Sequence, residues 1–156
     1  MIRLVPMTPE ELRSYLERSI PEYAQSHVES GRWRAEDAVA RSRAEHDQLL
    51  PNGVATPDQY LRTVWDAEQG VRVGEVWYAL QKQEGSPQLF VYWIGIEEAH
   101  RRRGYATDVL REVEREARRL GASRVALHVF GGNTGARALY ERLGFVTTNV
   151  LMAKTV

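Results

Sequence analysis

The spacing of apolar positions in the N-terminal third of the chain changes from alternating to helical. A short strand is predicted at Ile2–Val5. The segment Thr8–Glu11 then supplies an N-cap threonine, a proline at the first helical position and a capping-box glutamate, so a helix begins there. We expect Pro21 to kink or restart this helix and Gly31 to end it. A second helix is predicted at Ala35–Leu50.

The middle of the chain alternates between apolar and polar residues, as half-buried strands do. Three strands are predicted, at Gln59–Ala67, Val71–Lys82 and Gln88–Glu97. The connections Glu68–Gly70 and Gln83–Pro87 are short enough for hairpins. The three strands should therefore form an antiparallel meander.

The C-terminal third returns to helical spacing and predicts a crossover. Thr107–Leu120 has one apolar face and one charged face, as an amphipathic helix does. Arg124–Phe130 follows as a strand, which the crossover makes parallel to Gln88–Glu97. A last helix at Asn133–Leu143 and a last strand at Phe145–Ala153 complete the chain. The expected class is α/β (α+β), a mixed and mainly antiparallel central sheet flanked by about four helices.

Composition fits a single domain over residues 1–156, with 43% hydrophobic and 27% charged residues. Lys plus Arg and Asp plus Glu both count 21, so no global field calls for nucleic acid or an anionic membrane as partner. The longest apolar run, Leu89–Ile96, is far shorter than a membrane span, and the N-terminus lacks the apolar core of a signal peptide. We expect a cytoplasmic protein.

Two residue types narrow the chemistry. Cysteine is absent from the sequence, which excludes disulfides, thiolate metal sites and an acyl-cysteine intermediate. The four histidines are too scattered in sequence for a metal site, so no metal is expected: His27, His46, His100 and His128.

The stretch from Ile94 to Thr107 joins the end of a strand to the start of a helix through three arginines and a glycine. The first N–H groups of such a helix are unpaired, and together with the helix dipole they attract an anion. Gly104 permits a positive φ and a close backbone approach, and guanidinium groups suit phosphate oxygens. This turn is a candidate phosphate site.

A second motif runs from Asn133 to Phe145. Asn133 and Tyr140 are seven residues apart on the predicted helix, so they share one stripe with Arg137. Small and apolar side chains form the adjoining stripe. A polar stripe beside an apolar one faces a hydrated environment. The ordinary alternative is that Tyr140 is an aromatic residue at the edge of the core.

The two motifs resemble those of the Gcn5-related N-acetyltransferase (GNAT) superfamily. The segment Arg101-x-x-Gly104-x-Ala106 is similar to its (Gln/Arg)-x-x-Gly-x-(Gly/Ala) signature, and the second motif to its Asn-x-x-Ala-x-x-Leu-Tyr-x-x-x-Gly-Phe segment. The resemblance covers the chain from about Val73 onward. It implies a sheet whose parallel fourth and fifth strands splay apart, and acetyl-CoA as co-substrate.

The resemblance also implies roles for particular residues. The turn would bind the coenzyme A pyrophosphate, and the backbone of the preceding strand would pair with the pantetheine arm. Gly95 in that strand is consistent with a bulge or a close ligand approach, or with a glycine tolerated beneath Trp93. Tyr140 would protonate, or hydrogen-bond to, the departing thiolate. The implied cofactor-binding residues are Ile94, Gly95, Ile96, Arg101, Arg102, Arg103, Gly104, Tyr105, Ala106, Thr107, Asn133, Arg137 and Tyr140.

The general base is the point at which the chain departs from better-known family patterns. The position at which some members carry a glutamate on the strand before the turn falls near Phe90, and another family position falls on His128. Glu97 and Glu75 are the remaining nearby carboxylates. We prefer Glu97 and then His128, and an acceptor that binds already deprotonated stays open.

The leading interpretation is an acetyl-CoA-dependent N-acetyltransferase that acts on a primary amine of a small molecule or peptide. Two alternatives stay open, a non-catalytic acyl-CoA-binding or sensor module and a transferase of another acyl group. Tyr23, Trp33 and Trp77 could line the acceptor side, although isolated aromatics more often belong to the core. Acceptor identity and a homodimer stay open as well.

Overall fold

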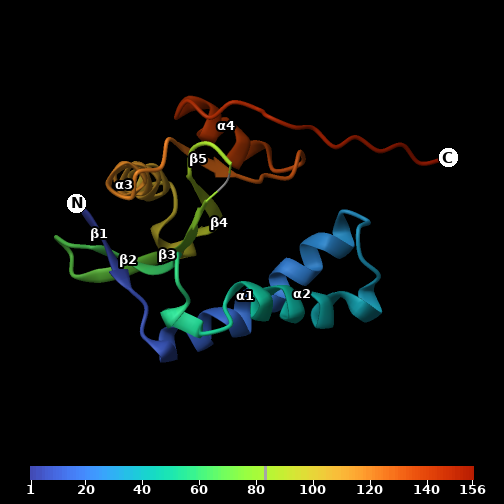
Figure 1. Cartoon of the computed structure of the whole chain (residues 1–156), viewed down its shortest axis with the longest axis horizontal. Coiled ribbons are helices and arrows are strands. Elements are labelled where there is room, and N and C mark those ends of the chain that lie inside the picture. The colour runs from blue at the N-terminus through green and yellow to red at the C-terminus, as the bar shows by residue number, and fades with distance from the viewer. Residues whose placement is uncertain (83) are drawn as a thin grey trace. The chain divides into compact units, whose positions relative to one another are not determined.

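The computed structural model describes residues 1–82 and 84–156, in two compact units that are treated separately, Met1–Ala126 and Leu127–Val156 (Figure 1). Gln83, in the predicted hairpin connection Gln83–Pro87, lies outside the described residues. In chain order the elements of the first unit are β1 (Ile2–Pro6), α1 (Pro9–Glu29), α2 (Ala35–Leu49), β2 (Gln59–Asp66), β3 (Val71–Gln81), β4 (Gln88–Ile96), α3 (Tyr105–Arg119) and β5 (Arg124–Leu127), the last residue of which belongs to the second unit. The second unit holds α4 (Thr134–Arg142).

The five strands form one sheet in the order β1-β2-β3-β4-β5. The first four are antiparallel neighbours, and β4 and β5 are parallel. Parallel pairing follows from the crossover through α3, because a chain that leaves one strand and returns through a helix runs in the same direction again. The predicted mixed, mainly antiparallel sheet is confirmed.

Helix α1 begins with the predicted capping box. The Glu11 backbone N–H donates to Thr8 Oγ1 at 3.1 Å, and the Thr8 N–H donates to Glu11 Oε2 at 2.8 Å. Of the two expected effects of Pro21, a restart is wrong, because α1 runs as one helix to Glu29, and a kink stays a prediction. Pro21 lies on the exposed face, where a carbonyl that has lost its N–H partner can be hydrated.

The two faces of the sheet in the first unit are covered by different helices. Figure 1 shows α1 and α2 on one side of β1–β4 and α3 on the other. On the α1 side, Leu12 and Tyr15 pack against Leu61 and Trp77 of the sheet. On the other side α3 buries its apolar stripe, which consists of Val109, Leu110, Val113 and Ala117. The amphipathic pattern of α3 is therefore satisfied as predicted.

Two boundaries differ from the sequence-based expectation by more than one residue, and one predicted strand is absent from the described residues. Helix α3 begins at Tyr105, two residues before Thr107, because Gly104 turns the chain directly into it. Strand β5 ends at Leu127 instead of Phe130. The predicted strand Phe145–Ala153 is wrong, because this segment has no strand pairing within the described residues. A segment with the residues of a strand forms one only if a neighbouring strand pairs with its backbone.

Candidate functional site

The turn after β4 forms the predicted open helix start. Gly104 has φ 85° and is the N-cap of α3, and no side chain caps this end. A positive φ here is easy only for glycine, so Gly104 directs the first N–H groups of α3 outward without steric strain. Ala106 and Thr107 follow, both half-buried. The local geometry is that of an anion site at a helix N-terminus.

Three exposed arginines precede this helix start. Arg101 Nε donates to the Ile96 carbonyl oxygen at 3.1 Å, which ties the turn back to the end of β4. Arg102 has a φ of 63°. Arg101, Arg102 and Arg103 form no ion pair with a carboxylate of the described residues. Three guanidinium groups without a carboxylate partner among the described residues therefore accompany the open N–H groups.

The backbone from Ile94 to Ile96 is shaped by two glycines. A Cβ on Gly95 would lie 2.8 Å from Trp93 Nε1, so any side chain here would displace the indole ring, which favours the alternative to a bulge. The bulge lies at Tyr92 instead, where the β3–β4 register shifts. A Cβ on Gly74 would lie 2.1 Å from the Gly95 carbonyl oxygen. Sequence reasoning missed Gly74, whose only signal was a glycine inside a central strand.

A chain of alternating charges connects α1 to the end of β4. Glu75 is 7% exposed and receives both terminal nitrogens of Arg18, at 3.0 and 3.1 Å, together with a hydrogen bond from Arg72. Arg72 Nε also lies 3.2 Å from Glu97 Oε1, and Glu97 is 46% exposed.

The same contacts give the two candidate carboxylates, Glu75 and Glu97, different environments. The hydrogen bond to Glu75 raises the pKa of Arg18. Glu75 is held inside by two cations, whereas Glu97 stays open to solvent. Sequence spacing alone did not show that Arg18 or Arg72 would lie here.

The three aromatic residues considered for the acceptor side are engaged within the first unit. Trp77 is 3% exposed, and its Nε1 donates to Gln59 Oε1 at 2.7 Å. Trp33 stacks on His27 with ring centroids 4.0 Å apart. The Tyr23 hydroxyl donates to Glu45 Oε2 at 2.9 Å, and burial and this bond raise its pKa to about 12. All three rings therefore have contacts within this unit, and a role on the acceptor side stays a prediction.

The second unit carries the second motif on α4. Asn133 caps the helix, and its Oδ1 accepts a hydrogen bond from the Ala136 N–H at 3.3 Å. Arg137 Nε lies 3.6 Å from Glu141 Oε1. Tyr140 lies beside Phe145, with ring centroids 5.8 Å apart, and burial raises the pKa of its phenol. Tyr140 therefore keeps its proton at neutral pH and can donate it.

His128, the second candidate base, follows the end of β5. Its side chain is exposed, and its ring meets Phe130 edge-on at 4.9 Å. It lies in the second unit, while Glu97 lies in the first. The structure therefore leaves the choice between these two residues as a prediction.

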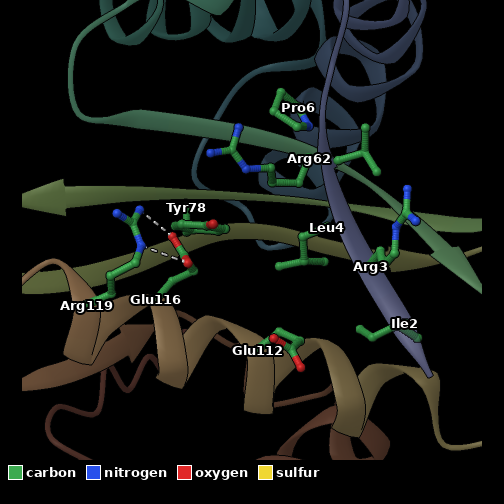
Figure 2. A pocket seen from close by; sticks show the side chains of 10 residues that line it. Ile2, Arg3, Leu4, Pro6, Arg62, Tyr78, Glu112, Glu116 and Arg119 are labelled. Carbon is green, nitrogen blue, oxygen red and sulfur yellow. Dashed lines mark hydrogen bonds and ion pairs between the residues drawn. The ribbon is translucent and has the colours of Figure 1, made fainter. Parts of the chain in front are cut away.

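A groove of about 540 Å³ lies elsewhere in the first unit, between β1 and α3. Figure 2 shows Leu4 on the β1 side of this groove and the Glu116–Arg119 pair on the α3 side. Of the predicted catalytic and cofactor-binding residues, none lines it. The groove is therefore distinct from the turn after β4.

The comparisons with known proteins agree with this geometry. Residues 21–145 match the model of the acetyltransferase (GNAT) family, and the chain belongs to that family. It is therefore an acyltransferase. It is 38% identical over 153 residues to the uncharacterised N-acetyltransferase YycN of Bacillus subtilis (strain 168), covering 98% of this chain and 97% of YycN. It is 33% identical over 151 residues to YdgE of the same organism, also an uncharacterised N-acetyltransferase, covering 97% and 96%.

Solved structures share the fold. The crystal structure of YycN matches with a TM-score of 0.92 and 37% identity, over 100% of this chain and 99% of that chain. The structure of AAC(6')-Iy in complex with the bisubstrate analogue CoA-S-monomethyl-acetylneamine matches with a TM-score of 0.65 and 16% identity, over 100% and 98%. The second likeness supports the fold alone.

No helix in the described part of the chain is long and apolar enough to cross a membrane. No group of three or more His, Cys, Asp or Glu side chains among these residues could hold a metal ion.

Proposed function

We propose that this protein is an N-acetyltransferase that moves the acetyl group of acetyl-CoA to a primary amine of a small molecule or peptide. The observation that carries the proposal is the open start of α3, with Gly104 at a positive φ and three arginines that have no carboxylate partner in the described part of the chain. Such a site suits a pyrophosphate better than a single charge, because one short turn carries several N–H donors and guanidinium groups. Family membership supports the same assignment.

The strand before the turn supplies the second part of the proposal. The backbone from Ile94 to Ile96 would pair with the pantetheine arm, and a backbone N–H near Ile94 would donate to the oxygen that gains charge during attack. The acceptor nitrogen attacks the thioester carbonyl carbon directly, a C–N bond forms, and the C–S bond breaks. The sequence contains no cysteine that could act as a nucleophile, which agrees with direct attack.

Two proton transfers complete the reaction. Tyr140 would give its proton to the departing sulfur and recover one from solvent, in line with a phenol that stays protonated at neutral pH. Glu97 would accept the proton that the amine loses, directly or through water, and its exposure allows this. His128 is the second candidate, and an acceptor that arrives deprotonated would need neither.

The test is thiol release from acetyl-CoA in the presence of a panel of primary amines and amine-bearing peptides, read for the parent protein and for Gly104→Val. A β-branched residue at φ 85° is strained and would change the backbone at the helix start, so Gly104→Val should lose acetyl-CoA binding by calorimetry. Circular dichroism would confirm that the variant is folded. Unchanged affinity in a folded variant would refute the site.

The same assay separates the alternatives. Binding of acetyl-CoA without thiol release for any amine would favour a sensor module. Faster release from propionyl-CoA or succinyl-CoA would favour a different acyl group. A cytoplasmic location and a homodimer stay predictions.

A further inference from the structure

Tyr105, the first residue of α3, turns its side chain inward. It is 8% exposed, and its hydroxyl donates to Asp66 Oδ2 at 2.6 Å. Asp66 is the last residue of β2 and is 5% exposed. One short, charge-assisted hydrogen bond therefore joins the start of the candidate phosphate helix to the turn between β2 and β3.

Asp66 is held in place by the turn that it closes. Its Oδ1 accepts the backbone N–H groups of Glu68 and Gln69, both at 2.9 Å, and its own carbonyl oxygen accepts from Gly70 at 2.9 Å. The bond with Tyr105 is the main cause that lowers the pKa of Asp66, and the same bond raises the pKa of Tyr105. The pair is therefore a carboxylate and a neutral phenol over the neutral pH range.

The same hairpin also holds the other end of the phosphate turn. The Glu97 N–H, directly after β4, donates to the Val73 carbonyl oxygen of β3 at 2.9 Å. The residues between Glu97 and Tyr105 are thus anchored at both ends on the β2–β3 hairpin. Without the Tyr105–Asp66 hydrogen bond, only the end at Glu97 would remain bonded to the β2–β3 hairpin.

We propose that Asp66 is a positioning residue for the coenzyme A pyrophosphate. It acts through Tyr105, because the hydrogen bond sets the direction in which the first N–H groups of α3 point. This inference rests on the proposed function and assigns the Tyr105 side chain a role in support of the site instead of a contact with the cofactor. N–H donors hold an anion well only if their geometry is set in advance.

The test compares two acyl donors on the parent protein and on Tyr105→Phe. Acetyl-CoA carries the pyrophosphate, and S-acetylpantetheine lacks it. We expect Tyr105→Phe to weaken acetyl-CoA binding by about 10-fold in calorimetry, the scale of one lost hydrogen bond to a charged group. The kcat/KM for S-acetylpantetheine should stay at the parent value, because that donor never uses the start of α3.

The matched control is Tyr78→Phe. Tyr78 is another buried tyrosine on the α3 side of the sheet, and its hydroxyl lies near Arg62 without a well-formed hydrogen bond. Tyr78→Phe should leave both the binding of acetyl-CoA and the kcat/KM for S-acetylpantetheine at the parent values. Asp66→Asn, which keeps the size of the side chain, should weaken acetyl-CoA binding, and the double variant should lose no more than Tyr105→Phe alone. If Tyr105→Phe does not fold, Asp66→Asn provides the same comparison of donors.

The outcomes distinguish two kinds of failure. A parent protein that does not bind acetyl-CoA overturns the proposed function and this inference with it. A parent that binds, beside a Tyr105→Phe variant that binds equally well, overturns the inference alone. An equal fold-loss in acetyl-CoA affinity and in kcat/KM for S-acetylpantetheine would also overturn it, because it would show a general structural effect.

Discussion

Replacing Gly74 by alanine probes the closest backbone approach beside the candidate cofactor strand. Gly74 pairs with Ile96, and an added Cβ would lie 2.1 Å from the Gly95 carbonyl oxygen and 3.1 Å from the Ile96 Cα. Both obstacles are main-chain atoms, so neither can rotate away as a side chain could. Strand β4 would have to move away from β3.

The size of that movement sets the expected magnitude. A carbon and a backbone oxygen need about 3.2 Å or more, so the strands must separate by roughly 1 Å at this point. Overpacking of this kind costs about 1–3 kcal/mol of the free energy of unfolding. For a chain of this length the melting temperature should fall by roughly 2–12 °C. A misplacement of about 1 Å near the reacting groups can also lower the rate about 10²-fold.

The assay combines calorimetric melting with kcat/KM from thiol release. Gly132→Ala is the stability control, because no atom lies within 4 Å of its added Cβ and its φ is not positive. The control should melt within about 0.5 kcal/mol of the parent in unfolding free energy. Parent-like melting and parent-like kcat/KM in Gly74→Ala would refute the argument that β3 sets the position of the cofactor strand.

Three further predictions concern protons. Tyr140→Phe should lower kcat by about 10²-fold with little change in KM, because a hydrogen bond to the leaving sulfur strengthens mainly in the transition state; thiol release at the parent rate would make Tyr140 a structural residue. The kcat/KM profile against pH should lose its acidic limb in Glu97→Gln or in His128→Ala, whichever residue is the base, and unaltered profiles in both would leave neither as the base. Because the pKa of Asp66 lies below its ordinary value of 3.8, its contribution to stability should be present above that pH and fade as the pH falls through the lower folded value. The difference in melting temperature between the parent and Asp66→Asn should therefore shrink in acid, and a constant difference down to pH 2 would contradict this.

Local signals in the sequence predicted most of the helices and strands. The capping box at Thr8 and Glu11, the alternation from Gln59 and the amphipathic face of α3 each depend on residues a few positions apart, and the structure contains all of them. The candidate phosphate turn is another local signal. Gly104, the arginines before it and the helix after it are neighbours in sequence, so their spacing was enough to predict an open helix start.

Contacts between distant segments could not be predicted in this way. Arg18 reaches Glu75 across 57 positions, and Tyr105 reaches Asp66 across 39. A charged residue finds such a partner only after the sheet and its helices have packed. The tertiary structure therefore decided that Glu75 is held inside by two arginines while Glu97 stays exposed.

The errors have the same origin. Pro21 interrupts a helix only if the surroundings do not tolerate a missing hydrogen bond, and its place on the exposed face of α1 is a tertiary fact. The sequence of Phe145–Ala153 predicts a strand, yet a strand exists only where another strand pairs with it. The sequence determined the elements whose stability is local, while the tertiary structure decided pairing and burial, because both require partners that are far away along the chain.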